Sequence, residues 1–186
     1  MPARFSFRSI PLLPPGGKKG NPMYTLQQLT PADGREMYDL LQRIGANENG
    51  FINVVNGMDY NEFPAWLRTQ DRAARGEGLE DGVVPYIIYW LMDNGQPIGI
   101  GRLRLRLTDA LRHIGGNIGY AIDPNRRRQG CGKALLSLIL TEARRRKMDE
   151  LLVTIYPDNI ASRRVAEGCG GVCRKVTHER AYYDIR

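Results

Sequence analysis

The sequence predicts an α+β fold, with a single mixed, mostly antiparallel sheet, a central parallel β-α-β crossover and helices on both faces of the sheet. Two observations carry this prediction. Residues 84–93 and 97–107 are rich in apolar side chains and flank the turn DNGQ, which indicates an antiparallel hairpin. Residues 117–122 and 150–156 read as strands separated by a glycine-rich turn and a long apolar helix. Such a connection joins parallel strands in a right-handed sense.

The other predicted elements surround this centre. We expect a first strand at 23–29, a helix from Thr30 or Asp33 to Ile44, a loop at 45–57, a second helix at 61–75, the long helix at 130–146, a short helix at 158–168 capped by Asp158 or Asn159 and ended by Gly168, and a last hairpin within 170–186. The long helix is apolar on more than one face, so we expect it to pack deeply against the sheet.

Length and composition fit one globular domain. The chain has 186 residues, of which 42% are hydrophobic and 25% are charged. Four prolines and three glycines between Pro11 and Pro22 predict a poorly structured N-terminal extension at 1–22, with the folded domain at 23–186. No apolar run approaches the ~20 residues needed to cross a bilayer. Three scattered cysteines suit a reducing compartment, so we expect a cytoplasmic protein that does not enter a membrane.

Composition and motifs also bear on the class of ligand. The chain has 27 Lys and Arg residues against 20 Asp and Glu, a net charge of +7, which favours anionic ligands. We do not expect nucleic acid, because aromatic residues do not interleave the basic clusters as they do in an RNA-binding platform. We expect no metal site, because Cys169, Cys173 and His178 lack a fourth ligand and the usual zinc spacing.

The stretch RRRQGCGKALL (126–136) places basic residues and two glycines at the start of the long helix. The first amides of a helix have no partner within it, and the helix dipole adds partial positive charge there. Gly130 and Gly132 let an anion approach the main chain, and Lys133 and the arginines deepen the local potential. A diphosphate fits this description. The stretch lacks the GxxxxGK[ST] of a P-loop and the third glycine of a dinucleotide-binding turn.

Two motifs resemble those of the GNAT family of N-acetyltransferases. GYAIDPNRRRQGCGKALL resembles their motif A, a strand and a proline-containing turn followed by [QR]-x-x-G-x-[GA], here Arg127, Gly130 and Gly132. DNIASRRVAEGCGGV resembles their next motif, N-x-x-[AS] with a later E-x-x-G, and its asparagine is Asn159. The resemblance covers 24–186. The strand GGNIGY is also similar to a bacterial branch that often reads GGHIGY, with Asn117 in place of the histidine.

The resemblance implies acetyl-CoA as co-substrate, in the V where the two parallel strands separate. It implies that main-chain groups of the motif A strand pair with the pantetheine arm, that amides of the glycine turn hold the diphosphate, and that the asparagine helix contacts the arm from the opposite side. The residues so implied are Tyr120, Ala121, Ile122, Arg127, Arg128, Gln129, Gly130, Cys131, Gly132, Lys133, Asn159 and Ser162. By charge alone, the candidates to meet the ribose 3′-phosphate are Arg126, Arg163 and Arg164.

The resemblance further implies direct attack of a neutral amine on the thioester, with an acid for the departing thiolate. Many family members place a tyrosine acid seven residues after the motif asparagine, a position that is Ala166 here. Ser162 matches the serine that other branches use, and the equally weighted alternative is a helix-start serine making a local main-chain bond. Tyr156 is a second candidate, for which packing in the core is the favoured interpretation.

The base is less well indicated. Asn117 cannot take a proton. His113 lies in a turn near the expected entrance of the cleft and is a candidate, although a lone histidine in a turn is more often structural. Glu62 or Asp59 would have to act through water, and the simpler interpretation is that both are solvated.

We therefore predict an enzyme that transfers an acetyl group from acetyl-CoA to a primary amine of an unidentified small molecule or peptide. The positions Ala166 and Asn117 motivate an alternative, a catalytically inactive acyl-CoA-binding regulatory module. In RLRLRL (102–107) the arginines alternate with leucines, so one face of that strand is cationic. That face either prefers acidic acceptors or faces solvent. A homodimer is plausible from the sequence, which does not establish it.

Overall fold

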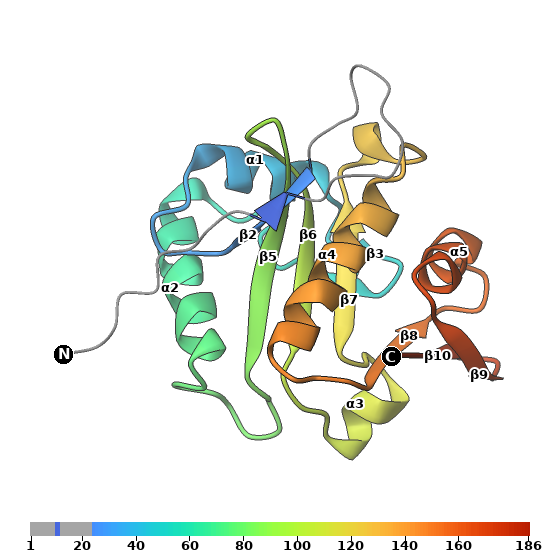
Figure 1. Ribbon diagram of the computed structural model, residues 1–186. Helices are drawn as coiled ribbons and strands as arrows, with labels where there is room; N and C mark the ends of the chain where they lie inside the picture. The colour runs from blue at the N-terminus through green and yellow to red at the C-terminus, as the bar shows by residue number, and fades with distance from the viewer. Residues whose placement is uncertain (1–9, 12–23) are drawn as a thin grey trace.

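The computed structural model describes residues 10–11 and 24–186 (Figure 1). Most of the predicted extension at 1–22 lies outside the described residues. Its described part, β1 (Ile10–Pro11), pairs antiparallel with β2 (Tyr24–Gln28), which is the first strand predicted from the sequence.

A five-stranded ladder forms the larger part of the sheet, in the order β1-β2-β5-β6-β7. After β1 and β2 come β5 (Tyr86–Asp93), β6 (Gln96–Arg104) and, at the edge, β7 (Ile118–Ile122). The predicted hairpin between β5 and β6 is confirmed, and both residues of its turn, Asn94 and Gly95, have positive φ angles of 48° and 81°. The register of β7 against β6 places Gly119 opposite Arg102.

A three-stranded ladder, in the order β8-β10-β9, forms the other part. Its strands are β8 (Leu151–Ile155), β9 (Val172–Val176) and β10 (Ala181–Ile185). The predicted last hairpin is confirmed as β9 and β10. The chain leaves the end of β7, returns through the long helix and enters β8 beside the start of β7, as the predicted parallel crossover requires. The expected single sheet is therefore divided between β7 and β8, where the two strands separate.

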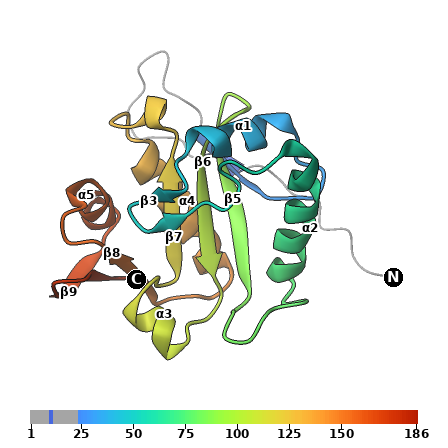
Figure 2. The ribbon, with the colours of Figure 1, turned by 180° about the vertical axis from the view of Figure 1, so that it is seen from behind.

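Helices cover both faces of the five-stranded ladder, so the predicted α+β fold class is confirmed (Figures 1 and 2). Helix α4 (Cys131–Arg145) packs on one face, where Leu135 and Ile139 join Tyr89 and Leu91 of β5 in a buried cluster. Helices α1 (Arg35–Arg43) and α2 (Phe63–Ala74) pack on the other face. Helix α5 (Ile160–Gly168) lies beside α4 and the three-stranded ladder.

Several local predictions need correction. Helix α1 begins at Arg35 without a side-chain cap, because the Asp33 carboxylate accepts bonds from Thr30 and from Trp90 Nε1 instead. The predicted loop at 45–57 contains a small hairpin of β3 (Asn47–Glu48) and β4 (Phe51–Ile52). The predicted helix at 61–75 starts as the 3-10 turn η1 (Tyr60–Glu62) before α2.

The segment after β6 differs most from the prediction. Strand β6 ends at Arg104 rather than at 107, and the chain enters α3 (Asp109–His113), a helix that the sequence analysis missed. Thr108 caps it by accepting a bond from the Leu111 N–H. A five-residue helix is too short to show a periodic apolar face, so the sequence pattern did not predict it. Among the described helices, none has the length and apolar character to span a membrane.

Candidate functional site

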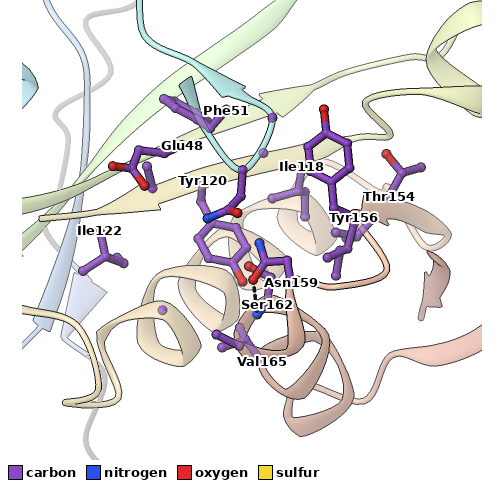
Figure 3. Close-up of a pocket in the computed structure, with 18 of the residues that line it drawn as sticks. Glu48, Phe51, Ile118, Tyr120, Ile122, Thr154, Tyr156, Asn159, Ser162 and Val165 are labelled. Atoms are coloured by element: carbon purple, nitrogen blue, oxygen red, sulfur yellow. Dashed lines mark hydrogen bonds between the residues drawn. The ribbon is translucent and has the colours of Figure 1, made fainter. Parts of the chain in front are cut away.

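A cavity of about 590 Å³ lies between β7 and β8 (Figure 3). Its walls come from β7, the turn before α4 and the first turn of that helix, β8, the first turns of α5 and the β3–β4 hairpin, with further residues from β6, the α3–β7 connection and Arg180. The cavity therefore occupies the gap at which the sheet divides into two ladders.

Asn117 explains why the two strands meet at one end and separate at the other. Its main-chain N–H donates to Leu152 O at 2.6 Å, and its side-chain Oδ1 accepts from the Leu152 N–H at 2.9 Å. Its Nδ2 donates to Arg104 O at 3.2 Å, and the residue is only 5% exposed. Beyond this junction β7 stays with β6, whereas β8 pairs with β10. Sequence analysis considered Asn117 as the replacement of a family histidine and as a residue unable to act as a base, and it missed this structural role.

Strand β7 presents free main-chain groups to the cavity. The Asp123 N–H donates to Ile98 O, and Asn117 O accepts from the Arg104 N–H, so these odd-numbered positions point toward β6. Main-chain groups alternate sides along an antiparallel strand. Tyr120 and Ile122 consequently point their N–H and C=O groups toward the cavity, whereas the groups of Ala121 are used by β6.

The turn between β7 and α4 has the conformation of an anion-binding nest. It starts with η2 (Pro124–Arg126), and then Arg128 and Gly130 take positive φ angles of 62° and 81°. Gly130 is the N-cap of α4 and supplies no side-chain bond, so the first amides of the helix have no side-chain cap. A Cβ added at Gly130 would meet no atom within 4 Å, which leaves the approach to these amides open.

The remaining residues of this turn are divided between the cavity and the outside. Arg128, Cys131, Gly132 and Lys133 line the cavity. Gln129 does not line it, and its side chain donates to Asn125 O. A Cβ at Gly132 would lie 3.4 Å from Val165 Cγ2, so a larger residue there would press on α5.

Most of the nearby arginines are already bonded within the protein. Arg127 donates to Ile122 O at 3.2 Å and pairs with Glu48 at 3.0 Å, which ties the β3–β4 hairpin to the nest. Arg126 pairs with the buried Asp93. Arg163 donates to Tyr183 Oη and to Pro157 O. Of the three charge-based candidates for a ribose phosphate, only the exposed Arg164 has no such bond among the described residues.

Helix α5 forms the wall opposite β7. Of the two predicted caps, Asp158 and Asn159, it is Asn159 that caps α5. Its Oδ1 accepts a bond from the Ser162 N–H at 3.1 Å (Figure 3). The Ser162 side chain lies beside the Tyr120 ring. The Tyr120 hydroxyl is buried and has no hydrogen-bond partner among the described residues. Burial raises the pKa of Tyr120 to about 12, although the Ser162 hydroxyl acts in the opposite direction. Sequence analysis assigned only the main chain of Tyr120 to the site.

Other catalytic candidates are placed less favourably. Ala166 is fully buried in the core. His113 is exposed on α3 and does not line the cavity, whereas the next residue, Ile114, does. Asp59 and Glu62 form a reciprocal cap on η1, outside the cavity. Tyr156 does line the cavity, and the Arg180 guanidinium lies 3.7 Å from the centre of its ring. Within the described ranges, no cluster of three His, Cys, Asp or Glu residues exists to hold a metal ion.

The comparison with protein-family models decides the family. Residues 24–172 match the model described as the acetyltransferase (GNAT) domain. This chain belongs to the GNAT acetyltransferase family. The predicted family and the predicted class of enzyme, an acyltransferase, are therefore confirmed. A search of curated proteins finds no match.

Solved structures show the same fold at low identity. The microcin C7 self-immunity acetyltransferase MccE, in complex with acetyl-CoA and AMP, is 16% identical over 93% of this chain and 97% of its own, with a TM-score of 0.63. The GNAT domain of S. lividans PAT is 14% identical over 95% and 96%, with a TM-score of 0.64. The putative acetyltransferase YncA from Salmonella typhimurium, with its cofactor acetyl-CoA, is 18% identical over 88% and 93%, with a TM-score of 0.57.

Proposed function

We propose that this acyltransferase moves an acetyl group from acetyl-CoA to a primary amine by direct attack. The observation that carries the proposal is that one cavity is lined both by the nest at the start of α4 and by the free edge of β7. A volume of about 590 Å³ lies within the range of small-molecule sites. Solved relatives of this fold, MccE and YncA, hold acetyl-CoA.

The chain's own groups fit the parts of acetyl-CoA in order along β7. Amides from Arg128 to Lys133 would hold the diphosphate at the end of the strand. The free N–H and C=O of Tyr120 and the N–H of Ile122 would pair with the pantetheine arm, since Ile122 O already accepts from Arg127. Asn159 keeps its Nδ2 for the arm, because its Oδ1 is used by the helix cap. This order directs the thioester toward Gly119 and the start of β7.

For the leaving thiolate we propose the Ser162 and Tyr120 hydroxyls as proton donors. They come from opposite walls and lie side by side in Figure 3. With its pKa raised to about 12, Tyr120 keeps its proton at neutral pH and can donate a hydrogen bond to the developing thiolate, whereas burial makes full transfer of that proton harder. This pair takes the place of the tyrosine that Ala166 replaces.

The acidic residues that line the cavity indicate how the acceptor amine loses its proton. Of the described residues that line the cavity, Glu48 alone is a carboxylate, and it is paired with Arg127 at the nest end. We therefore propose that the amine enters in its neutral form. A primary amine has a pKa of about 10.4, so kcat/KM should rise tenfold per pH unit between roughly pH 7 and 9. A plateau within this range would instead indicate a general base on the protein.

We further propose that the catalytic domain spans residues 23–186 and that the protein acts in the cytoplasm. Self-association is a separate question. Membership of the bacterial GG[HN]IGY branch is supported by the geometry of its glycines. Gly115 and Gly116 have φ angles of 118° and 61°, and a Cβ at Gly116 would lie 2.4 Å from Leu152 O, so both positions favour glycine where β7 meets β8.

Calorimetry and a thiol-release assay test the proposal. We expect acetyl-CoA to bind and to raise the melting temperature, with stabilisation of about 2.7 kcal/mol at 100 times its Kd. We expect free thiol to appear when amines are added. Binding without thiol release across a broad amine panel would favour the regulatory module. Absence of binding would overturn the proposed function.

A further inference from the structure

The end of the cavity farthest from the nest is cationic. Arg102 and Arg104 both line it. They lie two residues apart on β6 and so extend from the same face of the sheet. Opposite Arg102 on β7 is Gly119, which has no side chain to fill the space beside the guanidinium. In the proposed binding mode of acetyl-CoA the thioester lies toward Gly119, so it would face these two arginines.

Among the residues that the structure describes, no carboxylate pairs with either arginine. The Arg102 guanidinium lies 4.9 Å from the centre of the Tyr86 ring and 5.9 Å from that of Phe51. Its Nε is buried and has no hydrogen-bond partner among the described residues. Arg104 Nη1 donates to Gly115 O and Gly116 O, at 3.3 and 3.0 Å, and to no acid. These bonds give Arg104 a structural use that Arg102 lacks.

The two charges disfavour each other in this setting. Burial lowers the pKa of Arg102, and burial followed by the charge of Arg102 lowers the pKa of Arg104 to about 10. No carboxylate within the described part of the chain contributes to either shift. The carboxylate of the cavity, Glu48, is paired with Arg127 at the other end. Desolvated like charges without a counterion are costly, and an anion placed between them would relieve that cost.

The surroundings add a third cation and an apolar rim. Arg180 lines the same cavity and stacks on Tyr156, while its Nη1 donates to its neighbour's main-chain oxygen, Glu179 O. Two exposed apolar side chains, Ile52 and Ile114, also line the cavity and are 53% exposed each. The acceptor end thus offers cations and an apolar wall to an incoming molecule.

We propose that the acceptor amine carries an anionic oxygen group, a carboxylate or a phosphate, and that Arg102 binds it with support from Arg104. This inference rests on the proposed function and specifies its substrate class. A guanidinium binds both kinds of group through two parallel N–H bonds, and no carboxylate among the described residues competes for those of Arg102. Of the three arginines in RLRLRL, Arg102 and Arg104 are thereby assigned to substrate, whereas Arg106 lies outside the cavity.

The first test uses the unaltered protein and matched acceptors. ω-Amino acids of increasing chain length are each compared with their amides, and phosphoethanolamine is compared with ethanolamine, so that the amine stays constant. We expect kcat/KM to be roughly 10- to 100-fold higher for the anionic member of the best pair, as expected for a hydrogen-bonded ionic contact. A preference within the first series identifies a carboxylate, and a preference within the second a phosphate. Equal rates within every pair would overturn the inference.

The second test changes the arginine. Arg102→Met keeps an unbranched stem between the two rings but removes the charge. We expect the preference for the anionic acceptor to be lost while acetyl-CoA affinity stays unchanged, and Arg102→Lys to restore part of it. The control is Arg106→Met, which changes an exposed arginine of the same run that does not line this cavity. Loss of the preference in the control as well would also contradict the inference.

A readout without turnover separates this inference from the proposed function. Binding of N-acetylated ω-amino acids and of their amides to the CoA-loaded protein is measured by calorimetry. Tighter binding of the acids supports the inference, and no discrimination, including no binding, overturns it even if acetyl-CoA binds normally. If acetyl-CoA itself fails to bind, the result overturns the proposed function instead. Should Arg102→Met not fold, the acceptor pairs with unaltered protein still decide the matter.

Discussion

The two ends of the cavity are built from different parts of the polypeptide. At the end of β7 the proposed binding groups are main-chain amides, in a turn with positive φ angles at Arg128 and Gly130. At the start of β7 they are side chains, with Arg102 and Arg104 brought in from β6 and the strands joined by Asn117. The first end suits an anion that never varies, and the second suits a group that differs between acceptors.

The difference shows which constraints a substitution meets at each end. A main-chain site depends on conformation, so few residues other than glycine can hold it at positive φ. A side-chain site can be changed by one substitution without altering the backbone. Variants at the two ends should therefore separate cofactor binding from acceptor choice, which would allow acceptor specificity to diverge within a constant fold.

The largest expected effect comes from breaking the nest. Gly130→Asp puts an L-residue at a φ of 81° and a carboxylate against the diphosphate. Strain and like-charge repulsion act together, so we expect acetyl-CoA affinity to fall by at least ~100-fold, about 2.7 kcal/mol. Isothermal calorimetry measures it.

The matched control for the nest is Gly82→Asp. Gly82 has a φ of 80° and, like Gly130, open space around its missing Cβ, but it lies outside the cavity. It should reproduce the backbone strain without the loss of affinity. Equal affinity in Gly130→Asp and the parent would mean that the diphosphate does not bind at this turn.

The nest is also the part of the site that the sequence predicted best. Its glycines, basic residues and helix start are neighbours in the chain, so a short motif contains nearly all of its geometry. Asn117 and Leu152 are far apart in sequence, and their bond depends on how β8 returns beside β7. The pairing of Glu48 with Arg127 has the same character. Such contacts leave no local pattern, which is why sequence analysis missed them.

A similar contrast holds for the fold. The hairpin of β5 and β6 and the crossover through α4 were predicted, because turn residues and long apolar periodicity are local signals. The division of the sheet was not a property of any strand by itself. It arises because β8 uses its hydrogen bonds on β10, and only the resemblance to a family implied it.

The next largest effect should come from the middle of the cavity. Ser162→Ala removes a hydroxyl beside Tyr120 but keeps the main-chain N–H that Asn159 caps. If the hydroxyl pair protonates the thiolate, kcat should fall by roughly 10- to 100-fold while acetyl-CoA affinity is retained. Steady-state kinetics and calorimetry measure both. Ser137→Ala on α4, outside the cavity, is the control, and an unaltered rate in Ser162→Ala would exclude this serine from catalysis.

The junction between β7 and β8 should respond in stability. Asn117→Ala removes the bonds to the Leu152 N–H and Arg104 O and leaves both groups buried. We expect the free energy of unfolding to fall by about 2–3 kcal/mol, measured by urea denaturation. Asn61→Ala, an exposed asparagine, should change it by less than about 0.5 kcal/mol. A similarly small change at Asn117 would show that the strands do not depend on this side chain to meet.

The smallest expected effect concerns two buried tyrosines. The hydroxyls of Tyr120 and Tyr89 are both buried without a hydrogen-bond partner among the described residues, but only Tyr120 lines the cavity. Removing an unpartnered hydroxyl relieves a desolvation cost, so each change to phenylalanine should raise the free energy of unfolding by about 1 kcal/mol. Thermal and urea denaturation measure this. Only Tyr120→Phe should also lower kcat, because the Tyr89 hydroxyl is absent from the cavity lining. A rate loss of equal size in Tyr89→Phe would assign the effect to packing and remove Tyr120 from the proton-transfer pair.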